Sequence, residues 1–262
     1  MRNHVEGKSP RLDLRRIEEA GLNALQTQRQ LFYDGWVLRI SPGTAKRARS
    51  VNPHFSSSLP LDQKIAHCET VYARHGLSTL FRMTPFSQPH DLDRALAARG
   101  YEAFGKTFVQ TIHLDRPPEI PDPGFDVTLE APDTHAFVDA VGDLRNSTAS
   151  EREAHRERLQ NSPLGKRYAV VRAEGRVVCT AQVAVEDGLV GVFDVITASD
   201  ERGKGYATLA CASLLSWGWQ HGAHAAYLQV SADNAPAIAA YRKFGFTTGY
   251  TYHYRGRPGE RE

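Results

Sequence analysis

Hydrophobic positions along the chain follow two periods, which predict helices alternating with strands. Apolar residues at helical spacing predict a first helix from Asp13 to about Gln30. Runs and alternations of β-branched and aromatic residues predict strands further on. Helices are expected over residues 13–30, 61–75, 91–99, 133–141, 150–160 and 206–220, and strands over 35–40, 46–52, 77–83, 101–114, 125–129, 166–173, 177–186, 189–197 and 225–230, with a turn over 41–44. The fold class is therefore α/β, with mixed sheets and helices on their faces.

The order of these elements repeats along the chain. Helix, strand, helix and long aromatic strand follow one another from residue 61 to 114, and again from residue 206 to 255. Separations that agree this closely are expected of a duplicated supersecondary unit. Four prolines between residues 116 and 124 predict a stiff linker. We therefore expect two domains, over residues 1–115 and 125–262.

The segment between the last predicted helix and the strand before it carries the first candidate chemistry. Its sequence is Arg202-Gly203-Lys204-Gly205-Tyr206-Ala207, here called the glycine turn. Two glycines let the backbone approach a ligand closely, and the free N–H groups of a helix N-terminus attract anionic oxygens, pyrophosphate above all. The spacing fits neither a P-loop nor a dinucleotide-binding G-x-G-x-x-G motif.

The glycine turn and a second segment after it resemble the two sequence blocks of the GNAT superfamily of acetyl-CoA-dependent N-acyltransferases. Arg202-x-x-Gly205-x-Ala207 matches the first block, Q/R-x-x-G-x-G/A. In the second block an Asn opens a helix, a Tyr lies along it and Gly-Phe closes it, which matches Asn234, Tyr241 and Gly245-Phe246. The resemblance extends from about Phe125 to the C-terminus.

The resemblance implies two tandem GNAT-like domains, each a mixed central β-sheet flanked by helices. The first copy is expected to be degenerate. Residues 55–60 occupy the place of the glycine turn without any glycine, and Leu96 stands where Tyr241 stands. The first domain would then bind no acyl-CoA, and would brace the second domain and wall its substrate site.

The resemblance implies an N-acetyltransferase in which an acceptor amine attacks the acetyl thioester directly, within a ternary complex. Acetyl-CoA would be the acyl donor, and no metal is implied. The implied donor-binding residues are Asp194, Val195 and Ile196 through their backbone, Arg202, Gly203, Lys204, Gly205, Tyr206 and Ala207 around the pyrophosphate, and Asn234. A plain helix N-cap is the alternative for Asn234.

Two residues are candidates for proton transfer. Tyr241 matches the family position that protonates the leaving thiolate, and a phenol is protonated at neutral pH. The base is less defined, because Val190 and Val192 stand where several relatives place His or Glu. Asp194 either faces the acceptor amine as a base or is a satisfied residue at a strand end. Glu186 is a remoter candidate.

The acceptor site is less defined by sequence. Arg49 and Asn52, with Ser50 between them, end the predicted strand 46–52, which is either a sheet edge or a wall of the substrate cleft. His253, in the alternating aromatic tail, is a candidate proton relay. The helix over 150–160 is expected to be a solvated face, and its charged or titratable residues include Arg152, His155, Arg156 and Arg158.

Composition narrows the class of partner. The chain has 262 residues and a net charge of +2, so no basic excess argues for nucleic acid. Cys68, Cys179 and Cys211 lack metal-ligand spacing, and we expect buried reduced thiols and no metal site. No stretch approaches the roughly 20 apolar residues that span a bilayer. A cytoplasmic protein without a membrane partner is expected, and the oligomeric state stays open.

Alternatives to the leading hypothesis differ in what the chain does with the donor. The leading hypothesis is acetylation of a small amine or an amino-acid-like acceptor. An acyltransferase that uses a longer acyl-CoA, a non-catalytic acyl-CoA sensor and a protein-modifying acetyltransferase are the alternatives. Tyr241 argues against the sensor, because binding alone needs no acid.

Overall fold

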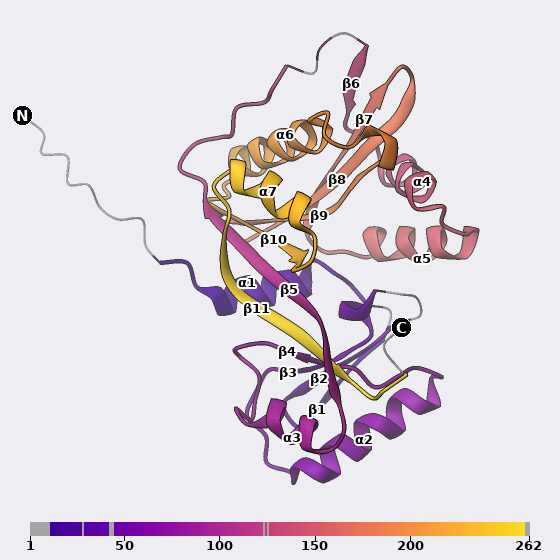
Figure 1. Ribbon diagram of the computed structural model, residues 1–262, viewed down its shortest axis with the longest axis vertical. Helices are drawn as coiled ribbons and strands as arrows, with labels where there is room; N and C mark the ends of the chain where they lie inside the picture. The colour runs from indigo at the N-terminus through magenta and orange to yellow at the C-terminus, as the bar shows by residue number, and fades with distance from the viewer. Residues whose placement is uncertain (1–10, 28, 42–44, 123, 125, 260–262) are drawn as a thin grey trace, which may run out of the picture.

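The computed structural model describes residues 11–27, 29–41, 45–122, 124 and 126–259 (Figure 1). The helices are α1 (Leu14–Asn23), α2 (Leu61–Arg74), α3 (Leu92–Ala98), α4 (Thr134–Arg145), α5 (Ala149–Gln160), α6 (Tyr206–Gln220) and α7 (Ala235–Lys243), with short 3-10 helices η1 (Lys46–Ala48) and η2 (Ser199–Glu201). The strands are β1 (Arg29–Tyr33), β2 (Trp36–Ile40), β3 (Val51–Pro53), β4 (Phe81–Met83), β5 (Glu102–His113), β6 (Val127–Glu130), β7 (Gly165–Ala173), β8 (Arg176–Glu186), β9 (Leu189–Thr197), β10 (Ala225–Ser231) and β11 (Thr247–Gly256). Among the described helices, none combines the length and apolar character needed to cross a membrane.

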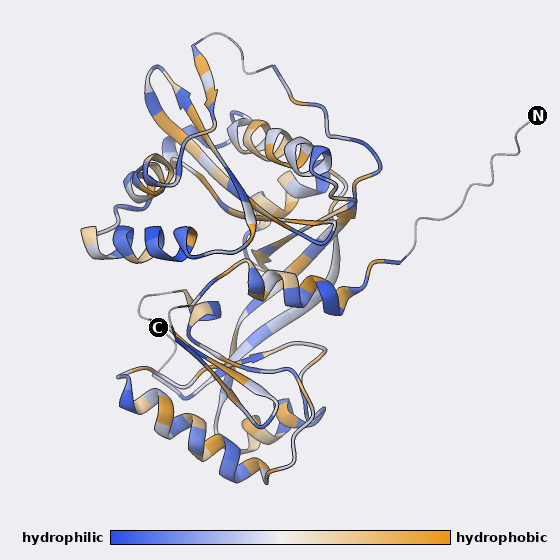
Figure 2. Cartoon of the chain, turned by 180° about the vertical axis from the view of Figure 1, so that it is seen from behind, coloured by the Kyte–Doolittle hydropathy of each residue, from blue (hydrophilic) through white to orange (hydrophobic). Residues whose placement is uncertain are grey.

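The described strands form one mixed sheet of 11 strands, in the order β1-β2-β3-β4-β11-β5-β10-β9-β8-β7-β6. Helices cover both faces of this sheet, so the predicted α/β class with a mixed sheet flanked by helices is confirmed. In Figure 2 hydrophobic residues concentrate in the strands, whereas α5 is mostly hydrophilic. The core therefore lies along the sheet, between it and the helices.

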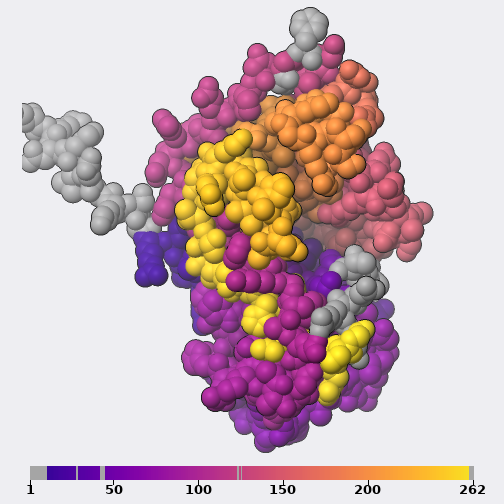
Figure 3. All heavy atoms as spheres, viewed as in Figure 1, coloured from indigo at the N-terminus to yellow at the C-terminus, as the bar shows by residue number. Residues whose placement is uncertain are grey.

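The two halves of the chain exchange strands at the centre of the sheet. β5, from the first half, pairs with β10 from Thr107 opposite Ser231 to His113 opposite Ala225. β11, at the C-terminal end, pairs with β4 of the first half as well as with β5. In Figure 3 the yellow C-terminal segment accordingly runs from the upper half of the molecule into the lower half. Each half thus contributes a strand to the other, which neither the repeat nor the linker predicts.

Opposite faces of the second half are covered by different helices. Ala169 and Val171 belong to the cluster packed under α6, whereas Tyr168 and Val170 pack with α4 and α5. This division follows from the alternation of side chains along a strand. α1 lies on the same face as α4 and packs against β9 and the strands beside it.

A buried polar layer joins α1 to the first half and to β11. Glu18 of α1 and Arg82 of β4 form an ion pair, and each is 1% exposed. The Tyr250 hydroxyl, on β11, donates to the Glu18 carboxylate at 2.5 Å. Arg82 also stacks on the ring of Tyr252, 3.8 Å from its centroid. These contacts connect three segments that are distant in sequence.

The predicted first helix is too long. α1 ends at Asn23, and Arg29–Tyr33 forms β1, which pairs in antiparallel register with β2. The turn between them is Asp34-Gly35, and both residues have left-handed backbones, with φ of 41° and 82°. That conformation is typical of the two-residue hairpin turn for which Asp-Gly is a strong signal. A local hairpin signal therefore overrides an approximate helical period.

The predicted return strand over residues 46–52 is also wrong in its bounds. Residues 46–48 form η1, and only Val51–Pro53 pairs with β2 as β3. Most of the predicted turn over 41–44 lies outside the described residues. The three cysteines Cys68, Cys179 and Cys211 are buried and unpaired, as predicted.

Candidate active site

Two parallel strands of the second half separate near the middle of the sheet. β9 and β10 pair only from Leu189 opposite Ala225 to Val192 opposite Leu228. Beyond that point β9 stays with β8 and β10 stays with β5. Backbone groups of the two diverging strands then face an opening in which no strand of the described residues pairs with them. We call this the strand opening; an extended ligand with amide groups is suited to it.

A β-bulge lies on β9 directly beside the strand opening. The register between β8 and β9 shifts between Thr180 opposite Ile196 and Gln182 opposite Phe193, so Asp194 and Val195 both face one residue of β8. Asp194 has a left-handed backbone, with φ of 48°. A non-glycine residue in this conformation is strained and is held by its surroundings. The bulge turns backbone groups out of the ladder at the edge of the opening.

The Asp194 side chain is held by three donors. Its carboxylate contacts Arg145 of α4 at 2.8 Å, His155 of α5 at 3.3 Å and Gln182 of β8 at 2.5 Å. The Thr180 hydroxyl donates to the Asp194 carbonyl at 3.2 Å. Burial alone would raise the pKa of Asp194, but the hydrogen bond from His155 and the charge of Arg145 hold this pKa well below its usual value. A carboxylate in this state is a poor base, and the arrangement fixes the bulge.

The glycine turn leads from η2 into α6. Gly203 and Gly205 have φ of 82° and 89°, and Gly205 is the N-cap of α6. A Cβ added at either position would meet no atom of the described residues within 4 Å, so it is the left-handed backbone that requires glycine here. Among the described residues no side chain caps α6, which leaves its first N–H groups available to an anion. The Lys204 ammonium lies 2.8 Å from Glu201 at the edge of the turn.

Tyr241 lies on α7 and is half-buried on the α6 side of the sheet. Its ring packs edge-on against Phe246 at 6.1 Å, and its hydroxyl makes no hydrogen bond within the described part of the chain. Burial raises the pKa of Tyr241, and the nearby thiols of Cys211 and Cys179 add to this rise. Tyr241 packs against the hydrophobic cluster that includes Cys211 of α6 and Cys179 of β8.

The remaining predicted donor contacts have ordinary structural partners. The Asn234 side chain accepts a hydrogen bond from the Ala237 N–H at 3.2 Å, so the N-cap alternative is present. Val195 packs toward the α6 cluster and Ile196 toward the α4 cluster, so their side chains face the two sides of the sheet. Arg202 is exposed with an extended backbone. Contacts of these residues with a donor stay predictions.

The predicted acceptor residues lie in the first half and in β11. Arg49 and Asn52 are buried, and the Asn52 amide donates to the Ser50 carbonyl at 2.9 Å. His253 lies 2.7 Å from Asp93 of α3, in register with Met83. The structure does not bring His253 into contact with Asp194 or the glycine turn among the described residues. Glu186 accepts a hydrogen bond from Asn23 at 2.9 Å, and it pairs with Leu189, at the end of β9 away from the bulge.

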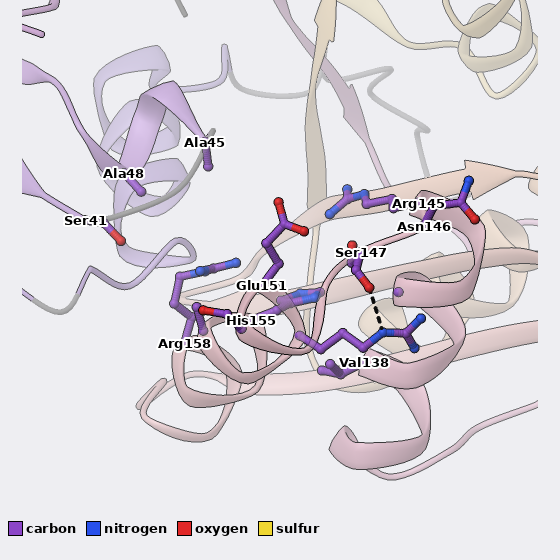
Figure 4. A pocket seen from close by; sticks show the side chains of 14 residues that line it. Ser41, Ala45, Ala48, Val138, Arg145, Asn146, Ser147, Glu151, His155 and Arg158 are labelled. Atoms are coloured by element: carbon purple, nitrogen blue, oxygen red, sulfur yellow. Dashed lines mark hydrogen bonds between the residues drawn. The ribbon is translucent and has the colours of Figure 1, made fainter. Parts of the chain in front are cut away.

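A pocket of about 470 Å³ opens between the first half and the α4–α5 corner (Figure 4). Ser41, Ala45 and Ala48 line one side of it, and Arg145, Ser147, Glu151, His155 and Arg158 are among the residues on the other. Two of these residues, Arg145 and His155, are also the partners of Asp194. The pocket therefore adjoins the bulge from the α4–α5 face of the sheet.

The prediction of a wholly solvated helix over residues 150–160 is wrong for His155, which is 8% exposed. His155 and Leu159 are the buried residues of α5 among those described. Their spacing of four residues marks a narrow inward face, a signal that the surrounding charged residues obscure in the sequence. No group of three or more His, Cys, Asp or Glu within the described ranges is arranged to hold a metal ion.

Comparison with known proteins identifies relatives over nearly the whole chain. Residues 12–255 match the model of a family described as "Probable histone acetyltransferase Rv0428c C-terminal". The chain is 27% identical over 247 residues to the "Uncharacterized N-acetyltransferase YobR" of Bacillus subtilis, covering 93% of this chain and 98% of that protein. The family match includes both halves, not the second half alone.

Solved structures share the fold. A GCN5-related N-acetyltransferase from Kribbella flavida superposes with a TM-score of 0.72 at 20% identity, covering 94% of this chain and 95% of that one. A tandem GNAT protein from the clavulanic acid biosynthesis pathway has a TM-score of 0.60 at 14% identity, covering 79% of this chain and 74% of that one. At these identities the likeness extends to the fold alone.

Proposed function

The chain belongs to the GNAT acetyltransferases, in the family described as probable histone acetyltransferase Rv0428c C-terminal, and from this premise we propose that it acetylates the amine of a small molecule with acetyl-CoA. The observation that carries the proposal is that three features of the second half lie close together. The strand opening, the bulge at Asp194 and the uncapped start of α6 meet at one end of β9. An elongated donor with amide groups and a diphosphate suits these three features together.

In this proposal the backbone of the chain does most of the donor binding. The diverging backbone of β9 at Val195 and Ile196 pairs with the pantetheine amides, and the N–H groups of the glycine turn bind the pyrophosphate. Arg202 and Lys204 add positive charge at the rim. The fit is favoured by the open space at Gly203 and Gly205, where no side chain of the described residues intrudes.

Asp194 acts in this proposal as a positioning residue. Its carboxylate is already engaged by Arg145, His155 and Gln182, and its lowered pKa disfavours proton uptake. The acceptor would lose its proton to water or buffer in the adjoining pocket. The bulge that Asp194 holds then presents backbone donors at the edge of the opening, where the thioester carbonyl would lie.

The first half acts in this proposal as a support that binds no acyl-CoA. The segment before α2 corresponds to the glycine turn, and its backbone is already occupied. Asp34 accepts hydrogen bonds from the N–H groups of Ser58 at 3.0 Å and Leu59 at 2.9 Å. An internal carboxylate thus takes the place that an anionic ligand takes in a functional copy. We retain residues 1–115 and 125–262 as the proposed units, joined by the exchange of β5 and β11.

The donor test is Gly205→Ala, for which the chain offers a matched control. Gly222 lies at the other end of α6 with φ of 88°, and a Cβ there also meets no atom within 4 Å in the described part of the chain. Each substitution should cost about 1 kcal/mol of stability through left-handed strain. Only Gly205→Ala should weaken acetyl-CoA binding, by about tenfold, because it also displaces the N–H groups at the ligand. Isothermal calorimetry measures both affinities; equal affinities for the two variants would contradict the assignment.

The test for Asp194 is Asp194→Asn. The amide keeps the size of the side chain but leaves the Arg145 charge unneutralised, so the bulge should loosen and kcat should fall about 10–100-fold. If Asp194 only positions the bulge, the pH dependence of kcat/KM keeps its acidic limb. Loss of that limb in the variant would show that Asp194 is the titrating base.

Calorimetry with acetyl-CoA, followed by a thiol-release assay over a panel of amines, tests the proposed function as a whole. Donor binding with thiol release supports it. Donor binding without release for any amine favours a sensor, and tighter binding of a longer acyl-CoA favours another acyl group. Absence of binding by acetyl-CoA overturns the proposal.

A further inference from the structure

Arg158 stands out among the arginines of the α4–α5 corner. Arg145 pairs with Asp194, Arg152 with Asp143 at 2.9 Å, and Arg156 with Glu153. Arg158 has no ion pair or hydrogen bond with any described residue. It is nevertheless half-buried, and it lines the pocket beside the bulge. A half-buried guanidinium that forms no ion pair with the described residues can bind an anion that enters the pocket.

Arg158 lines a pocket that residues of both halves of the chain enclose. In Figure 4 Arg158 of α5 lies below Ser41 and Ala48, Arg145 of α4 lies on the opposite side of the pocket, and Glu151 stands between the two arginines. Residues 45 and 48 belong to the first half, so the two halves enclose this space together. A volume of about 470 Å³ admits a small molecule and lies within the range usual for such sites.

Groups of both charges surround Arg158. Burial lowers the pKa of Arg158, the carboxylates of Asp194 and Glu157 raise it, and the charge of Arg145 lowers it. Lys166 of β7 is a cationic neighbour of Arg158, with the ammonium 3.3 Å from the Ala24 carbonyl. Burial lowers the pKa of Lys166 to about 8, although the charge of Asp194 opposes this, and Arg158 lowers it further. Asp194 is neutralised by Arg145, and the carboxylate of Glu151 is engaged by the Thr148 N–H and hydroxyl in a capping box. An anion that enters the pocket can therefore pair with Arg158, which forms no hydrogen bond or ion pair with the described residues.

We propose that the acceptor carries an anionic group, a carboxylate, which binds Arg158 in the pocket while its amine faces the bulge at Asp194. The proposal rests on the proposed acetyltransferase function. A planar guanidinium binds a carboxylate through two parallel hydrogen bonds, and Lys166 adds charge without competing for that geometry. The acceptor class is then a small amino acid. A lysine-rich protein tail would bring its own positive charge against Arg158 and is disfavoured.

The test compares free L-amino acids with their amino-acid amides as acceptors, using thiol release from acetyl-CoA. Each pair differs only in the negative charge. The acids should be better substrates, and Arg158→Ala should raise KM for the acids about 10–100-fold, the range of a lost charge-assisted contact, while leaving the amides unchanged. Arg156→Ala is the matched control, since that arginine lies on the same helix and is paired with Glu153. Aminoalkyl phosphonates form a third arm that distinguishes a phosphonate-type anion from a carboxylate.

Direct binding separates failure of this inference from failure of the proposed function. Calorimetry with acetyl-CoA should give the same donor affinity for the wild type and Arg158→Ala. If acetyl-CoA binds and amides or a basic peptide are acetylated as well as acids, with no effect of Arg158→Ala, the inference is overturned and the enzyme assignment stands. If none of the anionic amines binds the protein at millimolar concentration in the presence of coenzyme A, the inference is also overturned. If acetyl-CoA does not bind, the proposed function itself fails.

Discussion

Tyr241→Phe is expected to lower kcat about 10²–10³-fold with little change in the affinity for acetyl-CoA, because the phenol is proposed to act only on the leaving thiolate. Burial raises the pKa of Tyr241, so the phenol stays protonated throughout the neutral range. The same rise makes full transfer of its proton to a thiolate unfavourable. A hydrogen bond to the developing sulfur charge is the contribution that this environment favours. Steady-state thiol release measures kcat of the wild type and of Tyr241→Phe, and calorimetry measures their affinities for acetyl-CoA.

The control for this experiment is Tyr168→Phe. Tyr168 is a buried tyrosine of the same half, but its hydroxyl contacts Thr134 at 3.3 Å on the α4 side of the sheet. The Tyr168→Phe variant should therefore have the kcat of the wild type. If Tyr241→Phe also turns over normally, the tyrosine has no part in the mechanism, and the thiolate must take its proton from solvent.

The donor side of the candidate site is local in sequence, and this is why sequence predicts it. The glycine turn joins one strand to the next helix, so two left-handed glycines and an uncapped helix start follow from adjacent residues. Tyr241 and Asn234 likewise lie within one short segment. The α/β class follows from the periods of the hydrophobic positions, because the period within each short segment indicates whether that segment is a helix or a strand.

The proposed acceptor side depends on contacts between distant segments, which the sequence does not predict. Asp194 meets Arg145 and His155 only because α4 and α5 fold over the bulge. Charged neighbours made His155 look like part of a solvated helix. The sequence does not predict the strand exchange for the same reason. The repeat predicts two separate sheets, whereas the pairing of β5 with β10 is a tertiary contact between distant segments. The Asp34-Gly35 hairpin turn, in contrast, is a local signal, and a helix predicted to extend to Gln30 does not take account of it.

The buried polar layer under α1 helps to hold β11 beside β4, which the exchange of strands between the two halves requires. β11 must leave the second half and stay beside β4, and Glu18 contacts both strands through Arg82 and Tyr250. These groups are deeply buried, so their partners are not replaceable by water. The layer therefore contributes to keeping the two halves in one sheet.

Glu18→Gln is accordingly expected to lower the free energy of unfolding by about 3–5 kcal/mol, because it leaves the Arg82 charge buried without a counter-ion. Glu19→Gln is the matched control, since Glu19 is the next residue of α1 and pairs with Arg16 near the surface. That loss should be about 0.5 kcal/mol. Urea unfolding followed by circular dichroism measures both. Equal losses in the two variants would contradict a structural role for the buried pair.

The difference in the free energy of unfolding between the wild type and Glu18→Gln should depend on pH, and this dependence is a second measurement. Burial alone would raise the pKa of Glu18, but the charge of Arg82 and its hydrogen bonds, with that of Tyr250, lower it below its usual value. A carboxylate with a lowered pKa stabilises the folded state above the unfolded pKa of about 4.3, and this contribution is lost as the pH falls below it. The advantage of the wild type over Glu18→Gln should therefore be constant near neutrality and shrink below about pH 4. An advantage that grows on acidification would mean that Glu18 is already protonated in the folded protein, and that Arg82 finds its stabilisation in the ring of Tyr252 instead.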